Sequence, residues 1–185
     1  MQGLSLITNF ITQEEHDALL KFIYEQKEWA SAPGQRRVLQ YGYKYNYTER
    51  DAKPEKTTPI PDLFVKVLLR KLEESKEIKL KVDQVIVNEY EPGQGIAPHI
   101  DHTKHFGPVV ASLSLGWAYN MNFAKQGGEE KKQLLLPVCS LLVLQDEARY
   151  KWTHSIERRL DDTLPTGETA ERGTRVSITF RSMKE

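Results

Sequence analysis

The sequence predicts a mainly β fold of the α+β class, a sandwich or jelly roll in which two early helices support one sheet. From Val82 onward the apolar residues alternate with a period of two, which is typical of half-buried strands. Glycine, proline or charged turns separate these short runs, and no helical pattern comes between them. We expect residues 1–185 to form a single domain, because 39% apolar residues can fill one core in a chain of this length.

Two amphipathic helices are expected before the strands. Thr12-Gln13-Glu14-Glu15 matches a capping box, and apolar residues then recur at helical spacing to about Glu25. Pro61 suits the first turn of a second helix, which is expected to end near Lys76. The predicted strands cover residues 82–90, 109–116, 118–123, 133–136, 140–145 and 174–181, with a hairpin loop at 125–130.

The composition favours a protein of a reducing compartment. The single cysteine, Cys139, lies in an apolar run and cannot form an intrachain disulfide. The first residues lack the pattern of a secretion signal, and no apolar run approaches the roughly 18 residues of a membrane span. The 26 basic and 26 acidic residues balance, so any contact with nucleic acid must come from a local patch. We expect a cytoplasmic monomer without a membrane segment.

His99 and Asp101 are the centre of a candidate metal site. In an extended segment, residues two apart point to the same face, so this pair offers an imidazole beside a carboxylate. Two histidines and one carboxylate form the facial triad of non-haem Fe(II) oxygenases, and His154 is the candidate for the second histidine. A lone histidine is more often a surface or satisfied core residue, so these residues alone leave the triad open. His102 and His105 are expected to be solvated loop residues.

The last predicted strand places Arg175 and Arg181 on one face, together with Ser177. If that face is buried, two guanidinium groups need anionic partners, because an unpaired buried charge is very costly. A dicarboxylate such as 2-oxoglutarate supplies them, since the planar fork of arginine matches a carboxylate. The alternative is that both arginines pair with acidic side chains at the surface.

The segment 36–56 is a candidate substrate-binding region. It has six basic residues against three acidic ones, and four tyrosines between positions 41 and 47 alternate with other residues. A strand here would put all four tyrosines on one face, where aromatic planes beside cations can stack bases and hold phosphates. The alternative is that this face packs against the core. The candidate substrate contacts are Arg36, Arg37, Tyr41, Tyr43, Lys44 and Tyr45.

Together these motifs resemble the AlkB-type Fe(II)/2-oxoglutarate dioxygenases over nearly the whole chain, from Leu6 to Arg181. The shared marks, in family order, are Asn88-x-Tyr90-x-Pro92-Gly93, His99-x-Asp101, His154 and Arg175-x5-Arg181. The resemblance implies a double-stranded β-helix (jelly roll) and places residues 36–56 in the nucleotide-recognition lid of the family. It also implies Fe(II) on His99, Asp101 and His154, and 2-oxoglutarate held by Asn88, Tyr90, Arg175 and Arg181 with Ser177 between the arginines.

Two departures from the family pattern leave the substrate open. The founding DNA-repair member has His-x-Asp-x-Asp, whereas Thr103 stands here in place of the second acid, and it has Asn where this chain has Ser177. Several motifs, among them Arg149 to His154, are most similar to the branch that hydroxylates a modified wobble uridine in transfer RNA. The resemblance implies an enzyme that uses molecular oxygen to demethylate or hydroxylate a modified base in RNA, transfer RNA or alkylated DNA. The alternatives are the same chemistry on a protein side chain or small metabolite, and a non-catalytic jelly-roll binding module.

Overall fold

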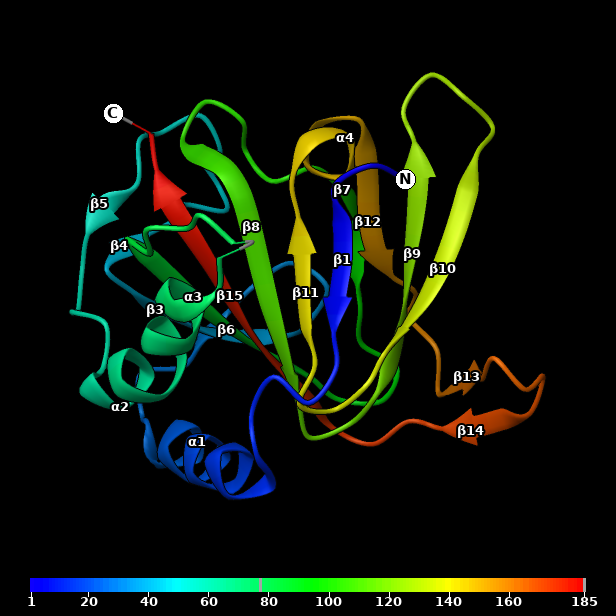
Figure 1. The fold of residues 1–185 in the computed structure, drawn as a ribbon, viewed down its shortest axis with the longest axis horizontal. Helices are drawn as coiled ribbons and strands as arrows, with labels where there is room; N and C mark the ends of the chain where they lie inside the picture. The colour runs from blue at the N-terminus through cyan, green and yellow to red at the C-terminus, as the bar shows by residue number, and fades with distance from the viewer. Residues whose placement is uncertain (77, 185) are drawn as a thin grey trace.

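A computed structural model describes residues 1–76 and 78–184, and two antiparallel sheets dominate it (Figure 1). The larger sheet has the strand order β1-β11-β8-β15-β6-β3-β2, and the smaller sheet has the order β10-β9-β12-β7. The strands of the larger sheet are β1 (Leu4–Ile7), β2 (Ala30–Ser31), β3 (Arg37–Tyr41), β6 (Gln84–Tyr90), β8 (Phe106–Leu115), β11 (Leu141–Leu144) and β15 (Arg175–Met183). Those of the smaller sheet are β7 (Ile96–His99), β9 (Tyr119–Lys125), β10 (Lys131–Leu136) and β12 (Trp152–Ile156). The mainly β prediction is therefore confirmed.

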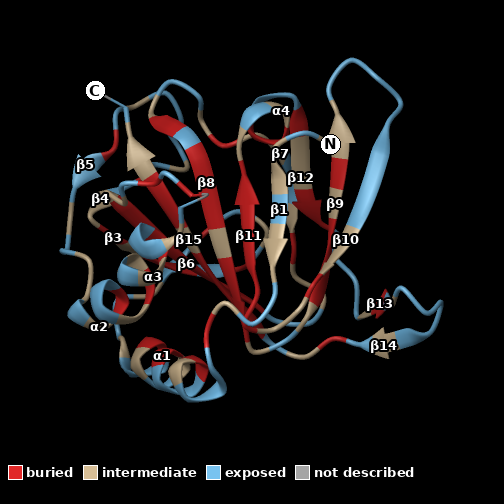
Figure 2. Cartoon of the chain, in the orientation of Figure 1, coloured by how far each residue is buried: buried red, intermediate tan, exposed pale blue. Residues whose placement is uncertain are grey.

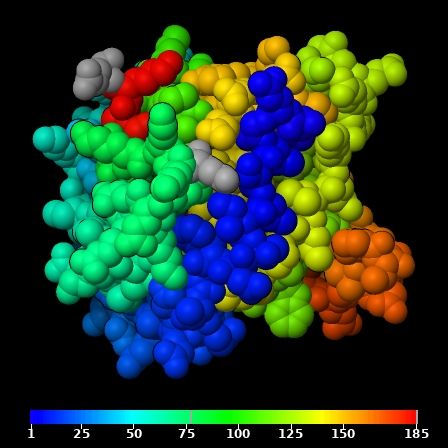
Figure 3. Space-filling view, viewed as in Figure 1, coloured from blue at the N-terminus to red at the C-terminus, as the bar shows by residue number. Residues whose placement is uncertain are grey.

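Two short hairpins and several helices complete the chain. The hairpins pair β4 (Tyr43–Lys44) with β5 (Glu55–Lys56), and β13 (Asp161–Thr163) with β14 (Thr169–Glu171). The β13–β14 hairpin projects from one edge of the molecule, in orange in Figure 3. The helical segments are α1 (Gln13–Glu25), α2 (Asp62–Phe64), η1 (Val65–Leu69), α3 (Arg70–Glu74) and α4 (Asp146–Tyr150).

The first predicted helix forms as α1, and the capping box at its start is present. The hydroxyl of Thr12 accepts a hydrogen bond from the Glu15 backbone N–H, and the Glu15 carboxylate accepts one from the Thr12 backbone N–H, both at 3.1 Å. These two bonds satisfy N–H groups that have no partner within the helix. Glu15 also pairs with Lys71 of α3 at 2.6 Å, which links the two helical regions.

The second predicted helix forms as the continuous segments α2, η1 and α3, the middle one a π-helical turn. The apolar faces of this helical region and of α1 both pack against one side of the larger sheet. Together they form a single core cluster. Figure 2 shows buried strands of the larger sheet behind α3 and above α1. The main members of the cluster are Leu19, Ile23, Phe64, Leu68, Leu72, Val85, Val87, Val176, Ile178 and Phe180.

The prediction that one strand carries all four tyrosines of residues 41–47 was wrong. Strand β3 ends at Tyr41 because Gly42 adopts a positive φ of 77°, which turns the chain. A Cβ at Gly42 would lie 2.0 Å from the Asp83 carbonyl oxygen, so the turn requires glycine. The turn places Tyr41 and Tyr45 on opposite sides of the sheet. Tyr41 faces the helices, where its ring packs edge-on against Phe64 at 5.9 Å, and Tyr45 lies on the other side.

Among the described residues, no helix is both long enough and apolar enough to cross a membrane.

Candidate active site

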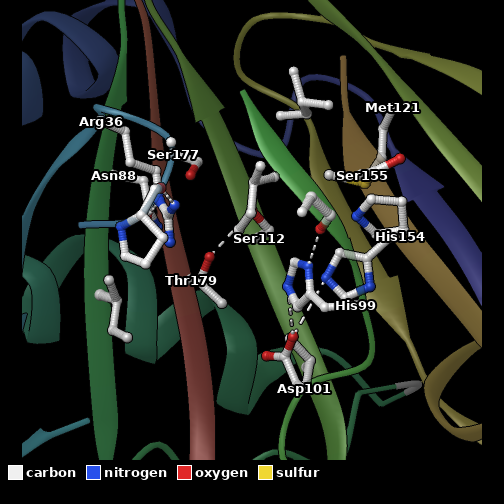
Figure 4. Close-up of a pocket in the computed structure, with 18 of the residues that line it drawn as sticks. Arg36, Asn88, His99, Asp101, Ser112, Met121, His154, Ser155, Ser177 and Thr179 are labelled. Atoms are coloured by element: carbon white, nitrogen blue, oxygen red, sulfur yellow. Dashed lines mark hydrogen bonds and ion pairs between the residues drawn. The ribbon is translucent and has the colours of Figure 1, made fainter. Parts of the chain in front are cut away.

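A cavity of about 760 Å³ lies between the two sheets, a size typical of ligand sites. Strands β6, β8, β11 and β15 of the larger sheet line one side of it, and β7 and β12 of the smaller sheet line the other. The turn between β2 and β3 and the segment that includes Tyr45, Tyr47 and Arg50 form part of its mouth. Figure 4 shows His99, Asp101 and His154 on one side of this space and Asn88 and Ser177 on the other.

The three predicted metal ligands meet because of strand pairing. His99 ends β7 and lies directly opposite His154 in the neighbouring strand β12, while Asp101 follows two residues after His99. The Asp101 Oδ1 atom is 3.5 Å from His99 Nε2 and 3.3 Å from His154 Nε2. One ligand atom from each residue lies within 4.8 Å of the other two, the grouping that a single metal ion needs.

Neighbouring groups hold these side chains in the forms that bind metal. The Ala97 carbonyl oxygen lies 2.8 Å from His99 Nδ1, so a proton on Nδ1 leaves Nε2 free to face Asp101. Burial alone would raise the pKa of the Asp101 carboxyl, but the Arg181 guanidinium holds this pKa well below its usual value. Burial and the neighbouring His99 lower the pKa of His154. The set is therefore an anionic carboxylate with a neutral His154 imidazole.

The predicted co-substrate residues form two cross-strand pairs. In the register of β15 and β6, Arg175 lies opposite Tyr90 and Ser177 lies opposite Asn88, and all four side chains line the cavity. Arg181 lies farther along the same face of β15 and donates a 3.0 Å hydrogen bond from Nη1 to Asp101 Oδ2. The alternating pattern predicted from the sequence thus brings both arginines into the cavity.

Arg175 is a buried cation without a protein carboxylate. Its side chain is 1% exposed, and its one hydrogen bond runs from Nη2 to the Ser114 hydroxyl at 2.9 Å. Among the described residues, no carboxylate lies within 4.0 Å of its guanidinium, and the Nε atoms of Arg175 and Arg181 find no acceptor. Burial lowers the pKa of Arg175, which reflects the cost of an uncompensated charge. A carboxylate ligand would remove this cost, so the cavity fits one end of 2-oxoglutarate.

Arg36 belongs to the cavity wall and is only 4% exposed. Its Nε donates a 3.0 Å hydrogen bond to the Asn88 amide oxygen, and its Nη1 donates to the Pro33 carbonyl. Because the amide oxygen of Asn88 is engaged by Arg36, the amide nitrogen is left to donate to a bound ligand. Arg36 therefore connects the predicted co-substrate residues with the mouth, where its guanidinium lies 5.6 Å from the Tyr47 ring.

The mouth of the cavity carries aromatic and basic side chains. The Tyr45 ring packs edge-on against Tyr47 at 5.2 Å and lies 6.0 Å from Phe106. Arg50 donates from Nε to the Tyr45 hydroxyl at 3.4 Å, and Arg158, which follows β12, lines the cavity from the smaller sheet. Stacking planes beside two cations are suited to a base and its phosphates.

Four of the predicted substrate contacts do not line the cavity. Arg37 forms a 2.6 Å salt bridge with Glu89, and its guanidinium lies 4.2 Å from the Trp29 ring. Tyr41 belongs to the core beneath the helices, and the turn at Gly42 directs Tyr43 and Lys44 into the small β4–β5 hairpin. The two tyrosines were chosen on the assumption of an unbroken strand, which the structure corrects, whereas Arg37 and Lys44 were chosen as cations of the basic segment.

His102 and His105 lie beside the site without joining the ligand set. Their rings stack at 4.2 Å, and each has its Nε2 atom 3.2 Å from an oxygen of Asp51. They are loop residues, as expected, but half-buried and not solvated, and they contact the segment that follows Arg50. Phe106 was not foreseen, because it precedes the predicted strand. Arg149 was noted only as the start of a shared motif and was given no role, because α4, with five residues, is too short to show a helical period.

The chain matches the model of the 2OG-Fe(II) oxygenase superfamily over residues 3–181. It is 40% identical to an uncharacterized protein of Acanthamoeba polyphaga mimivirus, covering 99% of this chain and 86% of that protein. It is 35% identical to the tRNA (carboxymethyluridine(34)-5-O)-methyltransferase ALKBH8 of Mus musculus over 98% of this chain. The chain covers only 30% of that protein, about a third of the length, as in the other vertebrate ALKBH8 relatives.

The fold is also shared with a solved structure. "The structure of OsALKBH1" superposes with a TM-score of 0.72 at 18% identity, covering 97% of this chain and 96% of that one. At this identity the match shows the jelly-roll fold alone, and it agrees with the predicted architecture. The chain therefore belongs to the 2OG-Fe(II) oxygenase superfamily, as an AlkB-like dioxygenase that uses Fe(II) and 2-oxoglutarate.

Proposed function

We propose that this enzyme demethylates or hydroxylates a modified base in nucleic acid, in RNA, transfer RNA or alkylated DNA. One observation carries the proposal: the ligand triad and the unpaired Arg175 share a cavity whose mouth presents Tyr45, Tyr47 and Arg50. The name of the mouse relative gives transfer RNA as a substrate of that larger protein, which supports the same class of substrate for this chain.

Each group of residues has a distinct role in the proposal. His99, Asp101 and His154 would hold Fe(II), while Arg175, Ser177, Asn88, Tyr90 and Arg181 would hold 2-oxoglutarate. Bound iron, with 2-oxoglutarate and oxygen, supplies the oxidising power that inserts an oxygen atom into a C–H bond. The chain orients the reactants and excludes water. The bond from Arg181 to Asp101 Oδ2 leaves Oδ1 to face the metal position.

The substrate enters past the aromatic side chains of the mouth. Of the predicted contacts, Arg36 and Tyr45 line the cavity, and we propose Tyr47, Arg50 and Arg158, which line it too, as further contacts. A base inside a duplex would first have to leave the stack, so a single strand or loop is the easier substrate. If the new alcohol forms on an N-methyl carbon, it collapses to formaldehyde and free base; on a stable side chain it remains.

Turnover of 2-oxoglutarate with different substrates tests the proposal. Succinate is measured with methylated single strands and duplexes, modified transfer RNA and protein extracts, and the products are identified by mass spectrometry. We expect nucleic acid to stimulate succinate formation and to gain an oxygen atom or lose a methyl group. Stimulation by the protein extracts alone would contradict the proposal and favour a protein side chain or metabolite as the substrate.

The variant Asp101→Ala tests the iron site. It removes the one carboxylate of the triad, so we expect it to lose both metal binding and succinate formation. His102→Ala is the matched control, because this neighbour contacts Asp51 and not the ligands, and it should keep both. Loss of metal by the control, with retention by Asp101→Ala, would show that the ligands were assigned wrongly.

We further propose that the chain acts as a single catalytic domain, as a monomer and in the cytoplasm. The single cysteine, Cys139, is free and buried, which supports a reducing compartment. Sedimentation of the purified chain checks its oligomeric state, and a stable dimer would contradict the proposal.

A further inference from the structure

Arg149 is a fully buried cation outside the co-substrate pocket. It lies in α4, is 2% exposed, and directs its guanidinium at the segment that runs from Asp101 to Gly107. Its Nη1 donates to the Asp101 carbonyl at 2.8 Å, its Nε to the Gly107 carbonyl at 3.1 Å, and its Nη2 to the Phe106 carbonyl at 3.4 Å. All three acceptors are backbone oxygens of this one segment.

Arg149 donates to backbone carbonyls, whereas a buried arginine in a structural ion pair donates to a carboxylate. Among the described residues, no carboxylate lies within 4.0 Å of its guanidinium, although burying such a charge is costly. Arg172, another buried arginine, instead forms two hydrogen bonds with the Asp162 carboxylate, at 2.7 and 2.9 Å. The guanidinium of Arg149 thus orients carbonyl groups next to a metal ligand.

The position of Arg149 connects two parts of the ligand triad. Helix α4 leads directly into β12, which carries His154, and α4 packs against both β12 and β8. The segment that Arg149 holds begins with Asp101. Two arginines therefore hold Asp101: Arg149 donates to its backbone carbonyl, and Arg181 donates to its side-chain carboxylate.

We propose that Arg149 is a positioning residue that holds the Asp101 segment against the His154 strand and so keeps these two ligands at the separation that iron requires. The inference rests on the metal site proposed above. Groups that orient metal ligands typically contribute about 10- to 100-fold to metal affinity, even though they do not touch the metal. The same is expected of Arg149.

Two variants of Arg149 and one of Arg172 test this role. Lysine in Arg149→Lys keeps the charge but lacks the fork that reaches three carbonyls, and Arg149→Met keeps only the apolar stem. Arg172→Lys is the matched control, because it makes the same change at a buried arginine outside the cavity. For each protein, thermal unfolding of the metal-free form is recorded first, and Mn(II) binding is then measured by calorimetry.

We expect Arg149→Lys and Arg149→Met to bind Mn(II) about 10- to 100-fold more weakly than the parent. Arg172→Lys should bind it as the parent does, even where its melting temperature falls. A merely structural role would lower the melting temperature at both sites without this difference in metal affinity.

Three results would overturn the proposal. Parent-like Mn(II) affinity in both Arg149 variants would remove Arg149 from the metal site. An equal loss in Arg172→Lys would show a general effect of stability. Failure of both Arg149 variants to fold would make Arg149 a determinant of folding. A parent protein that does not bind Mn(II) would instead contradict the metal site itself, so the two failures can be distinguished.

Discussion

Arg175 and Arg181 lie on the same face of β15, but their surroundings differ. Arg181 already has a carboxylate partner in Asp101, whereas the described part of the chain offers Arg175 only the Ser114 hydroxyl. Arg175 is therefore the cation with the greater need for an anionic ligand, and Arg181 contributes both to the co-substrate pocket and to the metal site. Substitutions at these two positions should separate the two contributions.

We expect Arg175→Lys to weaken 2-oxoglutarate binding by roughly 1–3 kcal/mol, the value of a charged hydrogen bond, because lysine loses the planar two-pronged contact. Mn(II) binding should not change. Arg181→Lys should weaken 2-oxoglutarate binding by a similar amount, again roughly 1–3 kcal/mol, and should also disturb the contact with Asp101. Titration of the Mn(II)-loaded proteins with 2-oxoglutarate measures both effects. An unchanged affinity in Arg175→Lys would place the co-substrate elsewhere.

The sequence predicts residues of the site that lie in strands better than those in turns. Period-two alternation correctly placed Arg175 and Arg181 on one face, because β15 is regular. Arg149 gave no such signal, since its role depends on carbonyl groups more than forty positions away in the chain. Backbone acceptors have no sequence signature, so only the folded structure reveals them.

The turn at Gly42 determines which tyrosines of residues 41–47 line the cavity. Period-two spacing between Tyr41 and Tyr47 predicts one strand, but this pattern does not show that Gly42 turns the chain against Asp83. The short strands β7 and β12, which carry the two histidine ligands, were not predicted either, because short strands show little alternation. Strand β12, which carries His154, alternates too weakly to be predicted, although its pairing with β7 creates the metal site.

Gly42→Ala should destabilise the protein and impair substrate binding. An L-residue with this positive φ costs about 1–2 kcal/mol, and the new Cβ would also lie 2.0 Å from the Asp83 carbonyl oxygen. The chain must shift there, which moves Tyr45 and Tyr47. Urea unfolding and oligonucleotide-stimulated succinate formation measure the two effects.

Gly127→Ala is the matched control for this prediction. Gly127 has a similar φ of 71°, but a Cβ there meets no atom within 4 Å. It should therefore show only the backbone cost, with normal use of substrate. Equal loss of stability in the two variants would mean that the contact with Asp83 is readily relieved.

For the whole molecule, the sequence predicts the architecture but not how the site is assembled. The jelly roll follows from short alternating runs, whereas the cavity combines residues from strands of both sheets with those of several connecting segments. Which of these segments become neighbours depends on strand order, which is a property of the complete fold. Because the net charge is balanced, any attraction for nucleic acid must come from a local patch of cations, and the cations at the mouth are the candidates.

Arg50 and Arg158 are the exposed cations that line the cavity, so we expect them to bind phosphates. Replacing both with alanine should weaken binding of a single-stranded oligonucleotide. It should also reduce the slope of log affinity against log salt by about 0.7 for each phosphate that the protein no longer neutralises, because fewer counterions are released. Fluorescence anisotropy over a range of salt concentrations measures both quantities.

Lys44→Ala is the control for the double variant, because Lys44 is exposed in the β4–β5 hairpin and does not line the cavity. If attraction depended only on net charge, removing this lysine would lower the salt slope as much as removing either arginine. We expect it to leave the slope unchanged, provided that all variants melt like the parent. An unchanged slope in the double variant would exclude Arg50 and Arg158 as phosphate contacts. A decrease with Lys44→Ala alone would move the nucleic-acid path to the outer hairpin.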